Sequence, residues 1–200
     1  MIGNTHDRFG AVAILLHWLI ALAALGLIAL GLYMTGLTYY DPLYNTLPAL
    51  HKSIGVITAM LIVLRIAWSL ANPSPIPAAG VKAWEQRAAK IVHRLLNLLL
   101  LSIVVSGYLI ATADGRPVEV FGWVQIQASF TLGDNQEELA GNLHYVLAMI
   151  MIGLATLHAL AALKHHFIHR DATLLRMFGV GAVPNANHST TTNPTTEEQT

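Results

Sequence analysis

The chain has 200 residues, enough for one domain, and 54% of them are hydrophobic while only 11% are charged. A composition this apolar excludes an ordinary water-soluble domain of this length. The chain has no cysteine, which excludes disulfides, thiolate metal sites and covalently attached c-type haem.

Four apolar runs follow in chain order, at residues 11–34, 50–70, 91–112 and 143–163. Each can cross a hydrocarbon core of roughly 30 Å at about 1.5 Å of helical rise per residue. The first run is too long for the core of a signal peptide, and further spans follow it, so we expect it in the mature protein. The pattern predicts an all-α integral membrane domain over residues 1–180, a four-helix bundle in contact with lipid, with no nucleic acid as a partner.

Positive charge is concentrated at one set of helix ends. Only Lys52 and Arg116 flank the other set, where the loops carry several acidic residues. Because cytoplasmic loops of membrane proteins are enriched in Lys and Arg, both termini are predicted to lie in the cytoplasm. The basic residues at that end are Arg8, Arg65, Lys82, Arg87, Lys90, Arg94, Lys164, Arg170 and Arg176.

The first two helices carry ionisable residues at unusual depth. His17 lies about 10 Å inside the inner boundary by helical rise. His51 begins the second helix on the outer side, and Arg65 follows fourteen residues later, on the same helix face near the inner end. Arg65 is therefore either an arginine that snorkels to the interface or the partner of a haem propionate.

A proline-rich break at residues 71–80 and an amphipathic segment at residues 81–96 lead into the third helix. His93 belongs to this segment and lies less deep in the membrane than His17. We therefore interpret His93 as a surface, hydrogen-bonding or quinone-proximal residue rather than an axial ligand.

The outer loop at residues 113–140 is long and contains Phe121, Trp123 and Phe130. These aromatic side chains favour a loop that folds back over the membrane face. Residues 183–200 are rich in Thr and Asn without apolar periodicity, which predicts a disordered polar tail.

The fourth helix carries His144 and, fourteen residues later, His158. Fourteen steps of about 100° end roughly 40° short of four full turns, so the two imidazoles share one face and lie about 21 Å apart along the axis. An ionisable group in hydrocarbon is costly and marks a functional site. His165 continues the same face into the interface, whereas His166 and His169 are interpreted as solvated.

Depth along the helices pairs four of the histidines. His51 and His144 both begin helices on the outer side, whereas His17 and His158 each lie about 10 Å from the inner boundary. An electron-transfer haem takes two strong axial ligands, held in the dry interior of a helix bundle. We therefore predict two b-type haems, with irons roughly 20 Å apart along the membrane normal, and electron transfer between them.

Several motifs accompany these histidines. They are HW at residues 17–18, LHKSIG at 50–55, SGYLI at 106–110, ADGRPVEVFGW at 113–123 and ALKHHFIHRDATLLRM at 162–177. Together with the spacing of His144 and His158, they resemble the bacterial cytochrome b561 family over residues 8–177. The resemblance implies a four-helix diheme bundle in the inner membrane, with His17 and His158 on the inner haem and His51 and His144 on the outer haem.

The resemblance also implies a function. Similar proteins pass electrons between a periplasmic reductant and the quinone pool, and one branch oxidises superoxide to oxygen while it reduces ubiquinone. By this resemblance His165 is the candidate proton donor near an inner quinone. At the outer site Lys52, with Arg116, is the candidate to attract an anionic donor.

Two alternatives remain open. The chain has no flavin, iron–sulfur or NAD motif, so it is also interpretable as the membrane-anchoring haem b subunit of a larger dehydrogenase or reductase, with a soluble redox protein as partner. A divalent-metal or haem transporter would use the histidines differently. Because the four spans contain no Asp, Glu or Pro, the features typical of ion transporters are missing.

Overall fold

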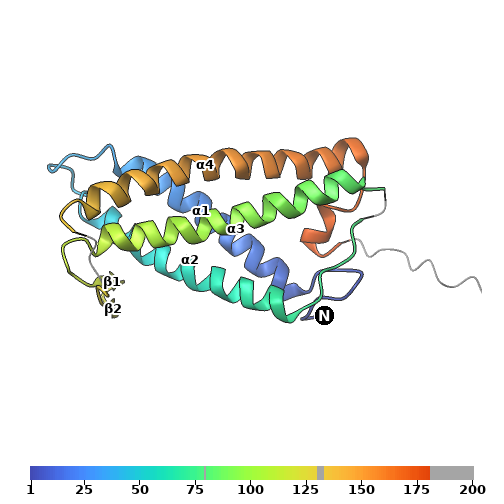
Figure 1. Ribbon diagram of the computed structural model, residues 1–200, viewed down its shortest axis with the longest axis horizontal. Coiled ribbons are helices and arrows are strands. Elements are labelled where there is room, and N and C mark those ends of the chain that lie inside the picture. The colour runs from blue at the N-terminus through green and yellow to red at the C-terminus, as the bar shows by residue number, and fades with distance from the viewer. Residues whose placement is uncertain (79, 130–132, 181–200) are drawn as a thin grey trace, which may run out of the picture.

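The computed structural model describes residues 1–78, 80–129 and 133–180, and four long helices dominate it. They are α1 (Ala11–Met34), α2 (Thr46–Ala71), α3 (Ala83–Ala111) and α4 (Gln136–Lys164). All four are long and apolar enough to cross a membrane, and they run side by side along the long axis of the molecule (Figure 1). The predicted all-α fold with four membrane-crossing helices is confirmed. The predicted tail at residues 183–200 lies outside the described residues.

The helices pack in chain order. Close backbone contacts join α1 to α2, α2 to α3 and α3 to α4, whereas α4 meets α1 and α2 much less closely. In the described part of the chain, the buried apolar side chains are Leu16, Ile20, Ile62, Val118, Ala140 and Met151. Most apolar side chains of the helices therefore face outward, as expected where lipid rather than water surrounds them.

Three helices begin upstream of the apolar runs that predict them, α2 by four residues and α3 and α4 by more. α3 starts at Ala83, where the carboxylate of Glu85 accepts the Lys82 backbone N–H at 3.2 Å and caps the first turn. α4 starts at Gln136, whose side-chain amide donates to the Leu109 carbonyl at 2.8 Å. Because these hydrogen bonds satisfy polar groups in the first turns, both helices extend beyond the apolar stretch that hydropathy detects.

Part of the long outer loop forms a hairpin of β1 (Val118–Val120) and β2 (Val124–Ile126). Its turn has positive φ at Phe121 (51°) and Gly122 (72°), a conformation that is unusual for a bulky residue. The Phe121 N–H donates to the Ser53 hydroxyl of α2 at 3.0 Å and fixes the turn there. The hairpin thus covers the start of α2, and we call this the hairpin end of the bundle.

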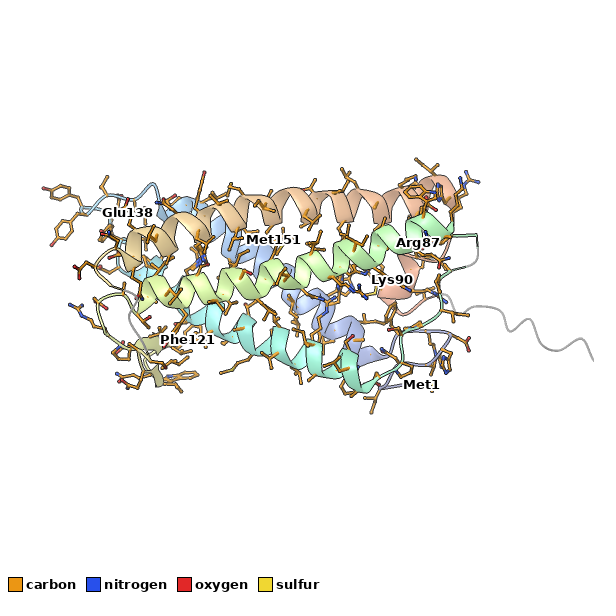
Figure 2. All side chains as sticks on the ribbon, viewed as in Figure 1. Met1, Arg87, Lys90, Phe121, Glu138 and Met151 are labelled. Atoms are coloured by element: carbon orange, nitrogen blue, oxygen red, sulfur yellow. The ribbon has the colours of Figure 1, made fainter. Side chains whose placement is uncertain are left out.

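The opposite end carries the N-terminus and most of the basic residues, and we call it the basic end. Figure 2 shows Met1, Arg87 and Lys90 at this end and Phe121 and Glu138 at the hairpin end. Here α4 continues as a π-helix, His165–His169, and the chain returns through a 3-10 helix, Leu175–Phe178.

The returning segment closes the basic end through a buried arginine. Arg176 is only 6% exposed, and its guanidinium donates to the Ile76 carbonyl at 2.6 Å and to the Asp7 carbonyl at 2.9 Å. The Trp18 indole N–H donates to the Met177 carbonyl at 2.7 Å. Segments from both termini and from the loop between α2 and α3 therefore meet at one place.

Candidate functional site: two pairs of facing histidines

The first pair lies toward the hairpin end. His51 of α2 and His144 of α4 face each other with ring centroids 6.1 Å apart, and both side chains are half-buried. The helices that carry them make few close backbone contacts. The two imidazoles therefore meet across an interface that the backbone leaves open.

The second pair lies toward the basic end. His17 of α1 and His158 of α4 have ring centroids 6.4 Å apart. His93 of α3 is also close, with its ring 5.1 Å from that of His158. The structure thus brings together the four histidines that depth along the helices had paired, and it adds His93 beside the second pair.

The spacing of both pairs fits a shared metal ion. Two imidazoles that bind one ion from opposite sides, each through a nitrogen at about 2.0 Å, have ring centroids roughly 6 Å apart. The observed separations of 6.1 and 6.4 Å match this requirement. The 5.1 Å between His93 and His158 fits less well.

Hydrogen bonds orient the imidazole of His144. Its Nδ1 lies 3.0 Å from the Ile103 carbonyl and 3.1 Å from the Ser106 hydroxyl. Because a carbonyl can only accept, Nδ1 carries the proton and Nε2 keeps its lone pair. This is how proteins commonly fix the tautomer of a metal-binding histidine. The Nδ1 of His51 is buried and has no hydrogen-bond partner among the described residues.

Two glycines leave room for the imidazoles of the first pair. A Cβ on Gly31 would lie 3.3 Å from Cε1 of His51, and a Cβ on Gly107 would lie 3.2 Å from Cε1 of His144. Both distances are shorter than an ordinary carbon–carbon contact. The opposing glycines belong to neighbouring helices, so only the tertiary structure identifies them.

Arg65 lies close enough to His17, His93 and His158 to interact with each electrostatically. It is half-buried and forms no ion pair with any carboxylate in the described residues. A partly buried guanidinium without a counterion fits an anionic group supplied by a ligand. This observation is compatible with the predicted role of Arg65 as a propionate partner.

The two basic residues predicted at the outer site differ in their surroundings. Lys52 is exposed and has no carboxylate within ion-pair distance in the described part of the chain. Arg116 forms an ion pair with Asp114 at 3.1 Å, with both side chains largely exposed. Lys52 is therefore the freer of the two cations at the hairpin end.

His165 lies in the π-helix at the basic end and is held by an acidic residue. Its Nδ1 is 2.5 Å from the Asp171 carboxylate. Burial would raise the pKa of this carboxyl, but hydrogen bonds from Thr173 and His165 outweigh burial and lower the pKa below its ordinary value. The side chain of His169 is 28% exposed, and its Nδ1 lies 4.0 Å from the buried carboxylate of Glu85. Neither contact is visible in the sequence.

Comparison with known proteins adds independent information. A family model described as prokaryotic cytochrome b561 matches residues 8–180. The chain is 44% identical over 176 residues to cytochrome b561 homolog 2 of Escherichia coli (strain K12), which covers 88% of this chain and 94% of that protein. It is 28% identical over 177 residues to cytochrome b561 homolog 1 of the same strain, covering 86% and 97% of the two chains. It is also 28% identical over 177 residues to the probable superoxide oxidase CybB of Yersinia pestis, covering 86% and 96%.

Proposed function

Because the chain belongs to the prokaryotic cytochrome b561 family, we propose that it carries electrons across the bacterial inner membrane from a periplasmic donor to the quinone pool. The family binds haem b and transfers electrons across membranes. What we propose for this chain is the identity of its haem ligands, its electron donor and its electron acceptor. The observation that carries it is the pair of facing imidazoles at each of two levels, with ring centroids 6.1 and 6.4 Å apart.

Four histidines would hold two haems. His51 and His144 would bind one near the hairpin end, and His17 and His158 the other near the basic end. Haem iron with two imidazole ligands supplies one-electron transfer at a potential that the surrounding protein sets. The chain's own part is to hold the ligands rigidly, as the Ile103 carbonyl does for His144, and to keep water away from them.

The basic end is proposed to face the cytoplasm, because Lys and Arg concentrate there. Arg65, partly buried beside the second histidine pair, would offset the negative charge of a propionate. The long separation of the two histidines on α4, about 21 Å for fourteen residues, spans most of the hydrocarbon core. Electrons that enter at one face would therefore leave near the other.

Superoxide is the proposed donor at the hairpin end. One relative is named a probable superoxide oxidase, and Lys52 offers an exposed cation without an acidic partner in the described residues. Each superoxide would give up one electron and leave as oxygen. The acidic residues around this end oppose long-range attraction of an anion, so Lys52 would act at short range.

Quinone, with ubiquinone as the candidate, is the proposed acceptor at the basic end. Reduction of a quinone to a quinol takes two electrons and two protons. The Asp171 carboxylate accepts the Nδ1–H of His165 and fixes the orientation of the ring. His165 would then release a proton from Nε2 to a quinone oxygen and recover it from the cytoplasmic solvent.

A reduced-minus-oxidised visible spectrum with haem-to-protein stoichiometry tests the ligands. We expect two low-spin b haems, with His144→Ala removing one and His158→Ala removing the other. His93→Ala is the matched control, because His93 is also a histidine beside the second pair but is not assigned as a ligand. A single haem in the parent protein, or loss of a haem in His93→Ala but not in His158→Ala, would overturn the assignment.

A second measurement tests the reaction. Purified protein supplied with superoxide and ubiquinone should form quinol, and His165→Ala should slow quinol formation while both haems stay in place. If the protein holds two haems but reduces no quinone, the donor and acceptor assignments fail. Stable co-purification with a soluble redox subunit would then favour the anchoring-subunit alternative.

A further inference from the structure

Three metal-binding side chains meet at the basic end, apart from the four paired histidines. Glu85, His165 and His169 can each offer one donor atom, and these atoms lie within 4.8 Å of one another. Glu85 is buried, His165 is half-buried and His169 is exposed. Two imidazoles and one carboxylate are the ligand set of zinc sites that keep a fourth position open.

The local structure aims these side chains at one point. One oxygen of Glu85 caps the first turn of α3 by accepting the Lys82 N–H at 3.2 Å. The other oxygen lies 4.0 Å from Nδ1 of His169. The π-helix brings His165 and His169 together, with ring centroids 4.9 Å apart. A small contraction of the donor atoms would suffice to bind one ion, since zinc ligands lie about 2.0–2.2 Å from the metal.

A further carboxylate lies behind one imidazole of this cluster. Asp171 holds Nδ1 of His165 at 2.5 Å, which leaves Nε2 for a metal. A carboxylate on the second nitrogen is the usual support of a zinc-binding histidine, because it fixes the tautomer and raises the basicity of the ligand. The cluster therefore has both the donors and the supporting group of a metal site.

Lys164 occupies part of this site. Its ammonium lies 3.2 Å from the Glu85 carboxylate, but its side chain is 44% exposed. The ammonium can therefore move into solvent when a cation with a higher charge binds Glu85. Lys164 is a competitor for the metal and also a means of testing the site.

We propose that Glu85, His165 and His169 form a binding site for a zinc-class divalent transition metal ion, and that the bound ion blocks quinone reduction by occupying Nε2 of His165. The geometry of the cluster alone supports the metal-binding site. The inhibition rests on the proposed function, in which that nitrogen delivers the proton.

Zinc affinity tests the site. The full-length protein is titrated with Zn²⁺ against a chromophoric chelator. His169→Ala and Glu85→Gln should each weaken zinc binding by more than about 100-fold. Loss of a residue that only hydrogen-bonds to a metal ligand costs roughly 10–100-fold in metal affinity, and loss of a ligand should cost more. His166→Ala is the matched control, since His166 belongs to the same π-helix but not to the cluster, and it should bind as the parent does. Lys164→Gln should bind zinc about tenfold more tightly, because it removes a positive charge next to the carboxylate.

Equal zinc affinity in the parent, His169→Ala and Glu85→Gln would refute the site. A separate measurement follows quinol formation as free Zn²⁺ is raised. His169→Ala should keep the basal rate and lose sensitivity to zinc. If zinc binds through the cluster but quinol formation is unaffected, the inhibition is refuted while the site stands. If no quinol forms without zinc, the proposed function has failed, and the affinity measurements still decide the site.

Discussion

Replacing Gly31 by valine should selectively weaken binding of the haem that we propose His51 and His144 hold. A Cβ at Gly31 would lie 3.3 Å from Cε1 and 3.8 Å from Nδ1 of His51, and ordinary carbon contacts are about 3.5–4.0 Å. Alanine therefore requires the imidazole to move by a few tenths of an ångström. The two further methyl groups of valine add bulk beside the same imidazole, so we expect a larger displacement.

The expected loss of haem affinity follows from the free-energy cost of overpacking. Extra methyl groups in a packed interior cost about 1–3 kcal/mol. If that cost falls on the ligand, affinity for the haem at the hairpin end drops by roughly 5–150-fold. The haem that we propose for His17 and His158 should be unaffected, because Gly31 is about fourteen residues, or roughly 21 Å, along α1 from His17.

Gly26→Val is the matched control. Gly26 also lies inside α1, is exposed, and has no described atom within 4 Å of a Cβ built on it. The assay is the haem-to-protein ratio after purification, with a redox titration that resolves the two haems. If Gly31→Val keeps both haems at the potentials found in Gly26→Val, then Gly31 does not provide the space for His51 and the reasoning is wrong.

Three further predictions concern the two ends of the bundle. Arg176→Ala removes two hydrogen bonds from a buried charged donor, each worth about 1.5–3 kcal/mol. The unfolding temperature of this variant in detergent should therefore fall well below that of Arg87→Ala, the control at an exposed site. Equal unfolding temperatures would show that Arg176 does not stabilise the basic end. Lys52→Glu should lower the superoxide-driven rate and flatten its salt dependence, and a variant with the parent's rate and salt dependence would remove Lys52 from the outer site. Hydrogen bonds from Thr38 hold the pKa of Asp41 below its ordinary value of 3.8. This contact therefore stabilises the folded loop above pH 3.8, and the stabilisation disappears as the pH falls through the lowered pKa. Thr38→Val should bring the Asp41 pKa back toward 3.8 in an NMR titration, and the same pKa in both proteins would show that the hydroxyl is not the cause.

Helical periodicity and hydropathy were sufficient to predict the four-helix bundle and the relative depth of its histidines along the helices. Both depend on the rise and turn of an ideal helix, which hold well inside a long apolar span. Counting residues from the helix ends therefore groups His51 with His144 and His17 with His158, the same neighbours that the structure brings within 6.4 Å. That these neighbours bind haem is still a prediction.

Features at the two ends of the bundle were not predictable in the same way. The hairpin has strands of only three residues, and its turn places a phenylalanine beside the glycine at positive φ, which is not one of the usual turn sequences. Glu85 stands among basic residues that look solvated, but tertiary packing buries it. Arg176 also looks like a surface residue, and only the meeting of three distant segments explains its burial. Contacts between distant segments have no periodic signal in the sequence.

One helix, α4, supplies a histidine to both pairs, and the partners come from two other helices. The distance between the two sites is consequently set by the backbone hydrogen bonds of a single helix. The distance between the two histidines within each site depends instead on how closely a neighbouring helix packs against α4. Loosening of the bundle by heat, detergent or a thinner membrane would open the sites one by one without changing the distance between them. The length of the proposed electron path would thus be unaffected by fluctuations that open either site.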